Sequence, residues 1–392
     1  MANILVYKNR IPSGTSTTIP EWTRPTDWLA MPTIGTQEFI GLLAITDDES
    51  NHIALLCRGA YTVDWGDGTI ENVADNVKAE HSYTYSGISS STLSTRGYKQ
   101  VLVRVTPQDG QNITTINLQQ RNTLINKTQC VSWLDIAVKG SNITTLLLGG
   151  LSVWQSMCEN VDIYSMGNIT SLAELFNNFS SLQKFTINNT SLVQNWANTF
   201  DGCRSLRVVP LFSMVSATSC VSMFYNCHSL LTVPLFITTN VNNMQQMFYL
   251  CTSLRTIPLL DMGKVTNALY MFQQCYSLQS IPLLNTIKVT NFAQIFYQCW
   301  SLQTIPNLNT SASVGFSATL GSTSVARGAF QGSRYAISYS GLFYSQSAIV
   351  EIFNGLGTAA GAQTITVSGN PGYAALTAAE RLIATNKGWT IA

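Results

Sequence analysis

The sequence predicts a mainly β protein with short helices, in which an N-terminal β-sandwich is followed by a solenoid of stacked coils and a C-terminal α/β cap. Three observations lead to this fold class. A motif around cysteine recurs every 24 residues, the region before it has short alternating apolar runs, and two helix-like segments lie near the C-terminus. A fixed period of this length is typical of a solenoid, because one unit cannot bury its own apolar face.

The repeat is aligned on cysteine, with a phenylalanine three residues before it, a leucine three after it and a proline seven after it. The cysteines are Cys203, Cys227, Cys251, Cys275 and Cys299. Earlier segments at 113–118 and 143–148 keep the Leu-x-x-Leu-x-Leu spacing of leucine-rich repeats. The Phe, Cys, Leu and Ile positions are expected to form buried ladders. Proline cannot donate to a strand ladder, so each coil should contribute a strand of only a few residues.

Four parts are expected along the chain: 1–35, 36–108, 109–310 and 311–392. The first is an extended, proline-stiffened docking arm, whose Trp22 and Trp28 should dock on the next domain or on a neighbouring subunit. The second is the β-sandwich, and the third is the leucine-rich-repeat solenoid, with its 24-residue repeats clearest at 200–306. The last contains irregular coils and the cap.

The cap is predicted from two helices and two strands. One helix is expected within 345–357, closed by Gly355 or Gly357, and a strand should follow at 363–369. The second helix should be capped by Thr377 and ended by Gly388, before a final strand. Such a unit can close the open end of a solenoid.

Composition limits the kinds of partner. Charged residues make up 10% of the 392 residues and the net charge is +1, which predicts neither nucleic-acid binding nor attraction to anionic membranes. No run of 18 apolar residues occurs, so membrane insertion is not expected. The N-terminus lacks the pattern of a secretory signal, which favours a chain made in the cytoplasm, with free thiols among its nine cysteines.

No catalytic site is expected. The three histidines, His52, His81 and His228, lie far apart, and none is near a nucleophile motif. A glycan depolymerase would need a pair of acids, but the repeats from 200 to 310 offer only Asp201 and Asp261, which lie two or three coils apart. The chain is therefore expected to be non-enzymatic, with depolymerase activity as a minor alternative.

The turn at 64–68 contains two aspartates, Asp64 and Asp67. Two carboxylates without an Asp-rich loop are a weak calcium signal, so no metal and no cofactor is expected. Gly68 should supply a positive φ at the end of this turn, and His81 should hydrogen-bond to it.

Binding is expected on the repeat face. Side chains next to the ladder positions vary within a constant frame, which is how repeat proteins build an extended binding surface. Aromatic side chains there suit sugar rings and protein partners alike, although they can also simply seal the coil edges. The candidate residues are Tyr225, His228, Tyr249, Tyr276, Tyr297 and Trp300.

Two resemblances add to this interpretation. The pattern MFxxCxSLxxIP, followed by Val-Thr-Asn at 265–267 and 289–291, resembles the BspA-like leucine-rich repeats of bacterial surface adhesins and tailed-phage virion proteins. The motif at 61–69, with His81-Ser-Tyr83 and Gly97-Tyr98, is similar to a PKD-type, Ig-like β-sandwich.

The resemblance implies a virion protein, such as a tail fibre, for host attachment and receptor binding. The missing export signal favours the virion over a bacterial adhesin. Expected partners are other virion proteins through the arm, a host surface glycan or protein, and further copies of the chain in a homo-oligomer.

Overall fold

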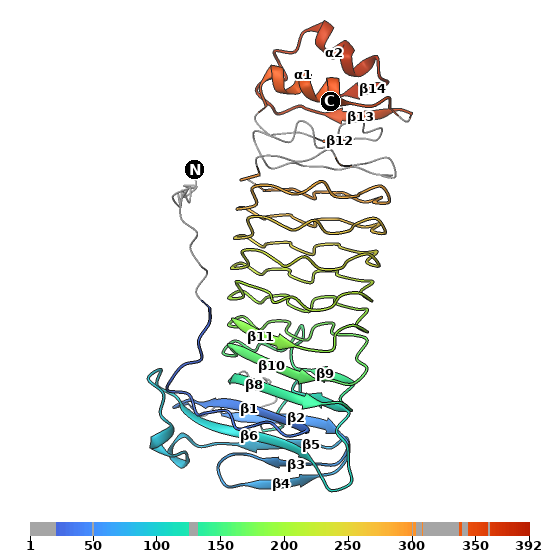
Figure 1. The fold of residues 1–392 in the computed structure, drawn as a ribbon. Coiled ribbons are helices and arrows are strands. Elements are labelled where there is room, and N and C mark those ends of the chain that lie inside the picture. The colour runs from blue at the N-terminus through green and yellow to red at the C-terminus, as the bar shows by residue number, and fades with distance from the viewer. Residues whose placement is uncertain are drawn as a thin grey trace.

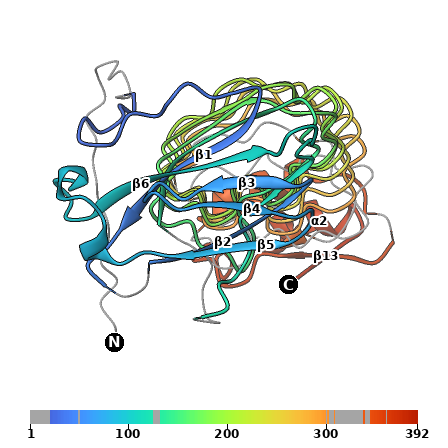
Figure 2. The same ribbon diagram turned by 90° about the horizontal axis from the view of Figure 1, so that it is seen from below.

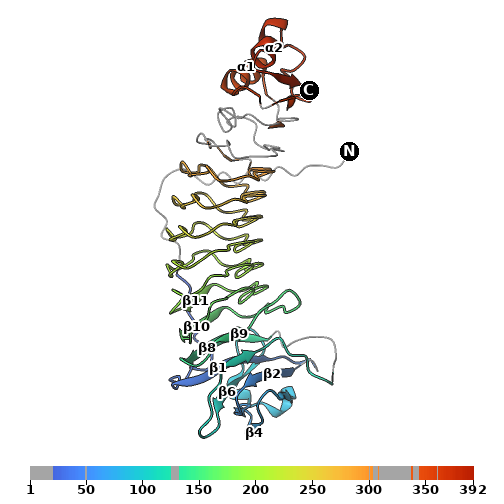
Figure 3. The same ribbon diagram turned by 90° about the vertical axis from the view of Figure 1, so that its right-hand side faces the viewer.

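The computed structural model describes residues 21–48, 51–124, 132–299, 301–302, 308, 344–359 and 361–392, together with the backbone of 337–338. Stacked coils form a solenoid that is closed at one end by β-sheets and followed at the other by a small α/β unit (Figures 1 and 3). Seen along the axis, successive coils lie over one another (Figure 2). The predicted mainly β fold class with a solenoid is confirmed.

Most of the regular strands lie in the first half of the chain. They are β1 (Gln37–Ile45), β2 (His52–Arg58), β3 (Tyr61–Asp64), β4 (Ile70–Val73), β5 (Lys78–Ser82), β6 (Lys99–Pro107), β7 (Thr115–Asn117), β8 (Trp133–Gly140), β9 (Thr145–Leu147), β10 (Asn160–Ser165) and β11 (Lys184–Ile187). Two short 3-10 helices, Tyr85–Gly87 and Ser90–Thr92, lie between β5 and β6.

Two sheets join the N-terminal strands to the solenoid. The first has the order β11-β10-β8-β1-β6-β3-β4 and the second the order β5-β2-β7-β9. Pairing is antiparallel from β4 to β8 and parallel from β8 to β11. In the second sheet the pairing likewise changes from antiparallel to parallel at β7. Both sheets therefore cross the boundary expected at residue 108, and the N-terminal strands cover the apolar end of the first coils.

The turn after β3 is held by three aromatic side chains. The His81 ring stacks on Trp65 at 5.0 Å, and its Nε2 lies 2.8 Å from the Asp67 carboxylate. The Tyr83 hydroxyl donates to the Trp65 carbonyl oxygen at 2.8 Å. Gly68 has a φ of +98°, as the tight turn requires. The predicted hydrogen bond from His81 to this turn is confirmed, and it engages one of the two aspartates considered as calcium ligands.

Within each coil, alternate backbone N–H groups bond in two directions. The N–H groups of Ser222, Phe224 and Asn226 donate to the following coil, at 2.8–2.9 Å. The intervening N–H groups of Met223 and Tyr225 donate three residues back within their own coil. Ser222 and Asn226, at the two ends of this segment, have positive φ, 52° and 61°. Every backbone donor of the segment is thereby satisfied although no regular strand forms.

The repeated proline explains where the regular sheet ends. The slot that holds Thr186 in β11 holds Pro210 in the next coil, which has no N–H to donate. Beyond β11, the described coils pair through single parallel bridges such as Val208↔Thr232 and Asn195↔Ser219. The expectation of very short strands in these coils is therefore confirmed.

One continuous core runs from β1 through the coils to Trp389. The ladder phenylalanines stack one coil apart, with ring centroids 5.3–5.7 Å apart and planes within 8° of parallel. The five ladder cysteines and their partner leucines are buried, as predicted. Each coil thus covers the apolar side of its neighbour.

The C-terminal unit contains α1 (Gln346–Gly355), α2 (Ala378–Thr385) and a parallel sheet of β12 (Ile337–Ser338), β13 (Gln363–Thr366) and β14 (Trp389–Ile391). Thr377 and Glu380 form a reciprocal capping box at the start of α2. The predicted helices, caps and strands are confirmed. Among the described residues, neither helix has the length and apolar composition needed to cross a bilayer.

Candidate functional site

The predicted aromatic residues occupy two slots beside the ladder cysteine. Tyr225, Tyr249 and Tyr297 lie two residues before it, and His228 and Tyr276 lie directly after it. All five side chains are half-buried. Trp300, the sixth predicted residue, lies outside the described residues. The five described residues form what we call the aromatic row.

The row is closely packed where two tyrosines are neighbours. The rings of Tyr225 and Tyr249 are 4.8 Å apart and 4° from parallel. In the next coil the equivalent slot holds the buried Gln273, and Tyr270 packs edge-on against Tyr249 at 6.5 Å instead. Because the faces of Tyr225 and Tyr249 cover one another, a partner would meet ring edges and hydroxyl groups more than open ring faces.

Burial favours the uncharged form of three residues in the row, Tyr225, His228 and Tyr276. Burial, followed by Tyr249 and Asp201, raises the pKa of the Tyr225 phenol, and burial followed by Tyr249 raises the pKa of Tyr276. Burial and the neighbouring Arg204 lower the pKa of His228. The row can therefore offer hydrogen-bonding groups and apolar carbon without a formal charge.

Asp201 occupies the same slot as Tyr225, one coil earlier. Burial, which outweighs a hydrogen bond from Asn177, raises the pKa of Asp201 to about 6. Asp261, the other acid of the core repeats, accepts the Gly263 N–H with its carboxylate at 2.8 Å. In the described part of the chain, no group of three His, Cys, Asp or Glu residues is placed to hold a metal ion.

The described part of the N-terminal arm packs on its own chain. Trp28 is buried with Leu42 and Tyr98, and its Nε1 donates to the Tyr98 hydroxyl at 2.9 Å. Trp22 donates to Glu159 at 3.0 Å, and Arg24 pairs with Asp135 at 2.7 Å. The tryptophans were expected to dock on the next domain or on a neighbouring subunit. In the structure both contact the following part of the same chain. Residues 1–20 of the arm lie outside the described residues.

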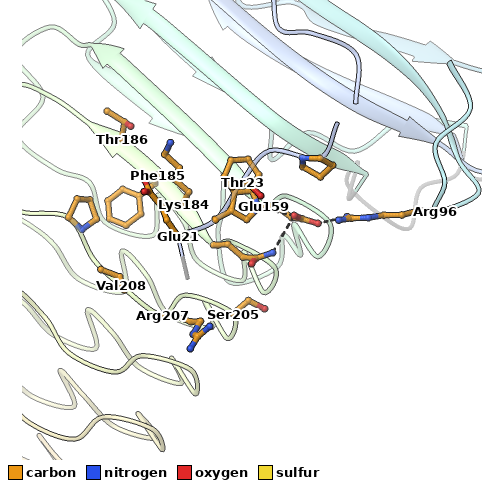
Figure 4. Close-up of a pocket in the computed structure, with 14 residues that line it drawn as sticks. Glu21, Thr23, Arg96, Glu159, Lys184, Phe185, Thr186, Ser205, Arg207 and Val208 are labelled. Carbon is orange, nitrogen blue, oxygen red and sulfur yellow. Dashed lines mark hydrogen bonds and ion pairs between the residues drawn. The ribbon is translucent and has the colours of Figure 1, made fainter. Parts of the chain in front are cut away.

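A cavity of about 720 Å³ lies between this arm and the side of the solenoid (Figure 4). Its arm side consists of Glu21, Trp22, Thr23 and Pro25. Its solenoid side contains β11 residues 184–186 and the segment 205–210 of the next coil. Glu159 lies at its inner side, with an ion pair to Arg96 and a hydrogen bond from Gln183 (Figure 4). Sequence reasoning missed this site, because its walls are more than 150 residues apart in the chain.

A second surface feature was also missed. The residue directly after the repeated proline is a leucine in four successive coils, and these leucines are 59–71% exposed. They are Leu211, Leu235, Leu259 and Leu283. Their 24-residue spacing is visible in the sequence, but apolar side chains at a fixed period do not by themselves indicate exposure. We call them the leucine column.

The fold and this surface define a repeat protein of the β-solenoid class. A family model described as "Mycoplasma protein of unknown function, DUF285" matches residues 151–233 and 218–329. These matches cover the coils that carry the described aromatic row and the leucine column. They agree at a coarse level with the repeat family expected from the sequence. Searches of curated proteins and of solved structures gave no match.

Proposed function

We propose that this protein is a non-enzymatic structural protein of a phage particle, a tail fibre or another surface fibre, that attaches to the host surface through its repeat face. The observation that carries this proposal is the constant coil frame that holds Tyr225 over Tyr249 at 4.8 Å while neighbouring slots vary. A rigid frame with variable side chains is suited to recognition over an extended surface.

The scarcity of charge supports a neutral partner. Residues 208–254 contain no Asp, Glu, Lys or Arg. Recognition there must use hydroxyl, amide and aromatic groups, which suit a glycan or an uncharged protein surface. Binding should consequently depend little on salt.

The N-terminal arm supplies the proposed attachment to other virion proteins. Because Trp22 and Trp28 are engaged within the chain, the anchoring function is assigned to residues 1–20, and the copies on the particle are proposed to form a homo-oligomer. Deleting residues 1–20 should leave the solenoid folded but not incorporated into particles. Normal incorporation of the truncated chain would contradict this assignment.

The attachment proposal is tested by replacing Tyr249 and Tyr276 with alanine. We expect host-cell adsorption to fall at least about tenfold, since removing an anchoring aromatic typically costs about 2 kcal/mol or more. Tyr164→Ala is the matched control, because Tyr164 is 45% exposed in β10 and outside the row. Unchanged adsorption by a folded double variant would place the binding face elsewhere. Incubation with host polysaccharide should release no new reducing ends.

A bacterial surface adhesin is the alternative function. The matching family model is described as a Mycoplasma protein, which favours a cellular origin. Labelling with an antibody against the protein separates the two proposals, since it would decorate purified particles in one case and cell surfaces in the other. We also propose that residues 36–108 are a PKD-type domain, supported by the contacts of Trp65, His81 and Tyr83.

A further inference from the structure

The cavity between the arm and the solenoid has a structural cause. β11 is the last regular strand of its sheet, and Pro210 in the next coil cannot continue the ladder. Glu21, Trp22 and Pro25 of the arm line the other side of the space beside this edge strand. The result is a concave site of about 720 Å³, within the range of small-molecule sites.

One aromatic ring in the cavity is fixed in position. Trp22 Nε1 donates to Glu159 at 3.0 Å, and Glu159 is itself held by Arg96 and by Gln183. Glu159 is only 7% exposed, so the carboxylate at the centre of this network is largely shielded from water. A ring whose orientation is set before binding loses little conformational freedom when a ligand packs against it.

The other charged side chains of the cavity include both cationic donors and a carboxylate acceptor. Lys184 and Arg207 supply positive donors from two adjacent coils, and Glu21 supplies a carboxylate acceptor. No ion pair joins these three side chains to another residue in the described ranges. Ser205 and Thr186 add hydroxyl groups, while Val208 and Pro210 add apolar carbon.

This combination selects a class of ligand. An anion would pair with Lys184 and Arg207 but would leave Glu21 without a donor, and a purely apolar ligand would remove all three groups from water without partners. A neutral sugar has hydroxyl groups that both accept from cations and donate to a carboxylate, and its C–H faces can pack on an indole. We propose that the cavity binds a short neutral oligosaccharide, with Trp22 as the packing surface and Glu21, Lys184 and Arg207 as hydroxyl-binding groups.

The cavity shares no residue with the aromatic row, so the sugar-binding proposal and the host-attachment proposal can each be contradicted without the other. Variants of the row should alter host adsorption without altering sugar binding in the cavity. Variants of the cavity should abolish sugar binding whether or not the row recognises the host.

The experiment uses the full chain and five probes: maltotriose, cellotriose, mannotriose, the trimer of N-acetylglucosamine, and trigalacturonate as the anionic comparison. Saturation-transfer NMR and calorimetry should detect binding of at least one neutral trisaccharide. The Lys184→Met, Arg207→Met double variant should weaken that binding at least about tenfold. Lys288→Met, at an exposed lysine outside the cavity, should leave it unchanged.

Three outcomes would overturn the proposal. The first is that none of the four neutral trisaccharides binds. The second is that trigalacturonate binds more tightly than any of them, which would make the site anion-selective. The third is that binding survives in the double variant while circular dichroism shows it to be folded. A Trp22→Phe variant, which keeps an apolar ring but loses the bond to Glu159, should give an intermediate loss.

Discussion

The thiol of Cys251 donates to the carbonyl oxygen of Phe224, 27 residues earlier in the chain and one coil away, with Sγ and O 3.1 Å apart. The same bond is made by the other four ladder cysteines, at 2.9–3.2 Å. Each thiol therefore satisfies a buried carbonyl oxygen of the preceding coil. The eight cysteines that the structure describes are free and buried.

These thiols should be inert in the native protein. Burial raises the pKa of the ladder cysteines, so little reactive thiolate forms at neutral pH. In a thiol titration we expect at most one of the nine cysteines to react before denaturation and all nine afterwards. Rapid labelling of the five ladder cysteines in folded protein, or their recovery as disulfides by mass spectrometry, would contradict the buried ladder.

Left-handed backbone at Leu250 predicts a stabilising substitution. Leu250 has a φ of 60°, and the equivalent slot holds Asn178, Gly202 and Asn226 in other coils. A left-handed conformation costs an ordinary L-residue about 1–2 kcal/mol, and less for asparagine. Leu250→Asn should therefore raise the free energy of unfolding by about 1 kcal/mol. Leu259→Asn, at a position without left-handed backbone, is the control. An equal gain in the free energy of unfolding there would show that relief of left-handed backbone is not the cause.

Two leucines five residues apart should respond differently to truncation. Leu254 is fully buried, whereas Leu259 in the leucine column is 59% exposed. Leu254→Ala should cost about 2–5 kcal/mol of stability, as expected for a large-to-small change in a core. Leu259→Ala should change stability by less than about 0.5 kcal/mol. Chemical denaturation of both variants measures the difference, and similar losses would show that the column is buried in solution.

The raised pKa of Asp201 predicts a pH dependence. Its folded pKa of about 6 lies above the usual value of 3.8, so the folded state holds its proton more tightly than the unfolded state. This contribution to stability is complete below about pH 3.8 and is lost as the pH rises through about 6. A shift of two units corresponds to about 3 kcal/mol, which solvent screening of this partly exposed group reduces to about 1 kcal/mol.

Asp201→Asn removes that titration. The variant should match the parent protein at pH 4 and be more stable at pH 7.5, as measured by thermal melting at both values. Asp261→Asn is the control. A gain for Asp201→Asn that is equal at both pH values would show that the effect does not come from ionisation.

Lys387 is predicted to hold the cap together. Its ammonium group donates to the carbonyl oxygens of Phe353, Asn354 and Leu356 at the end of α1, at 2.7–3.0 Å. Lys387→Met keeps most of the side chain but leaves those carbonyls without their charged donor, at a cost of about 1–3 kcal/mol. Hydrogen exchange should become faster in α1, while Lys288→Met should leave it unchanged. Unaltered exchange in the Lys387 variant would rule out this role.

The features that sequence alone predicted are those that depend on local pattern. The 24-residue period specified that Phe224, Cys227 and Leu230 are buried, because a coil can cover its apolar side only with the same positions of the next coil. The capping residue Thr377 and the turn at Gly68 were likewise predicted, since caps and turns depend on a few adjacent residues.

The features that sequence reasoning missed depend on which segments meet in space. The leucine column was not predicted, and the structure leaves its four side chains exposed although they are apolar. The contact between Tyr225 and Tyr249 follows from the period. The edge-on packing of Tyr270 against Tyr249, in the coil where Gln273 replaces the next tyrosine, does not.

By itself, then, the sequence determined the repeat, its buried ladders and the order of the parts, because these follow from periodicity and from hydrophobic burial. Only the tertiary structure decided that both N-terminal sheets continue into the coils, that residues four apart adopt left-handed backbone, and that Trp22, Lys184 and Arg207 line one cavity. These features arise where segments far apart in the chain pack together. Their geometry depends on the path of the whole backbone, which no local pattern of residues specifies.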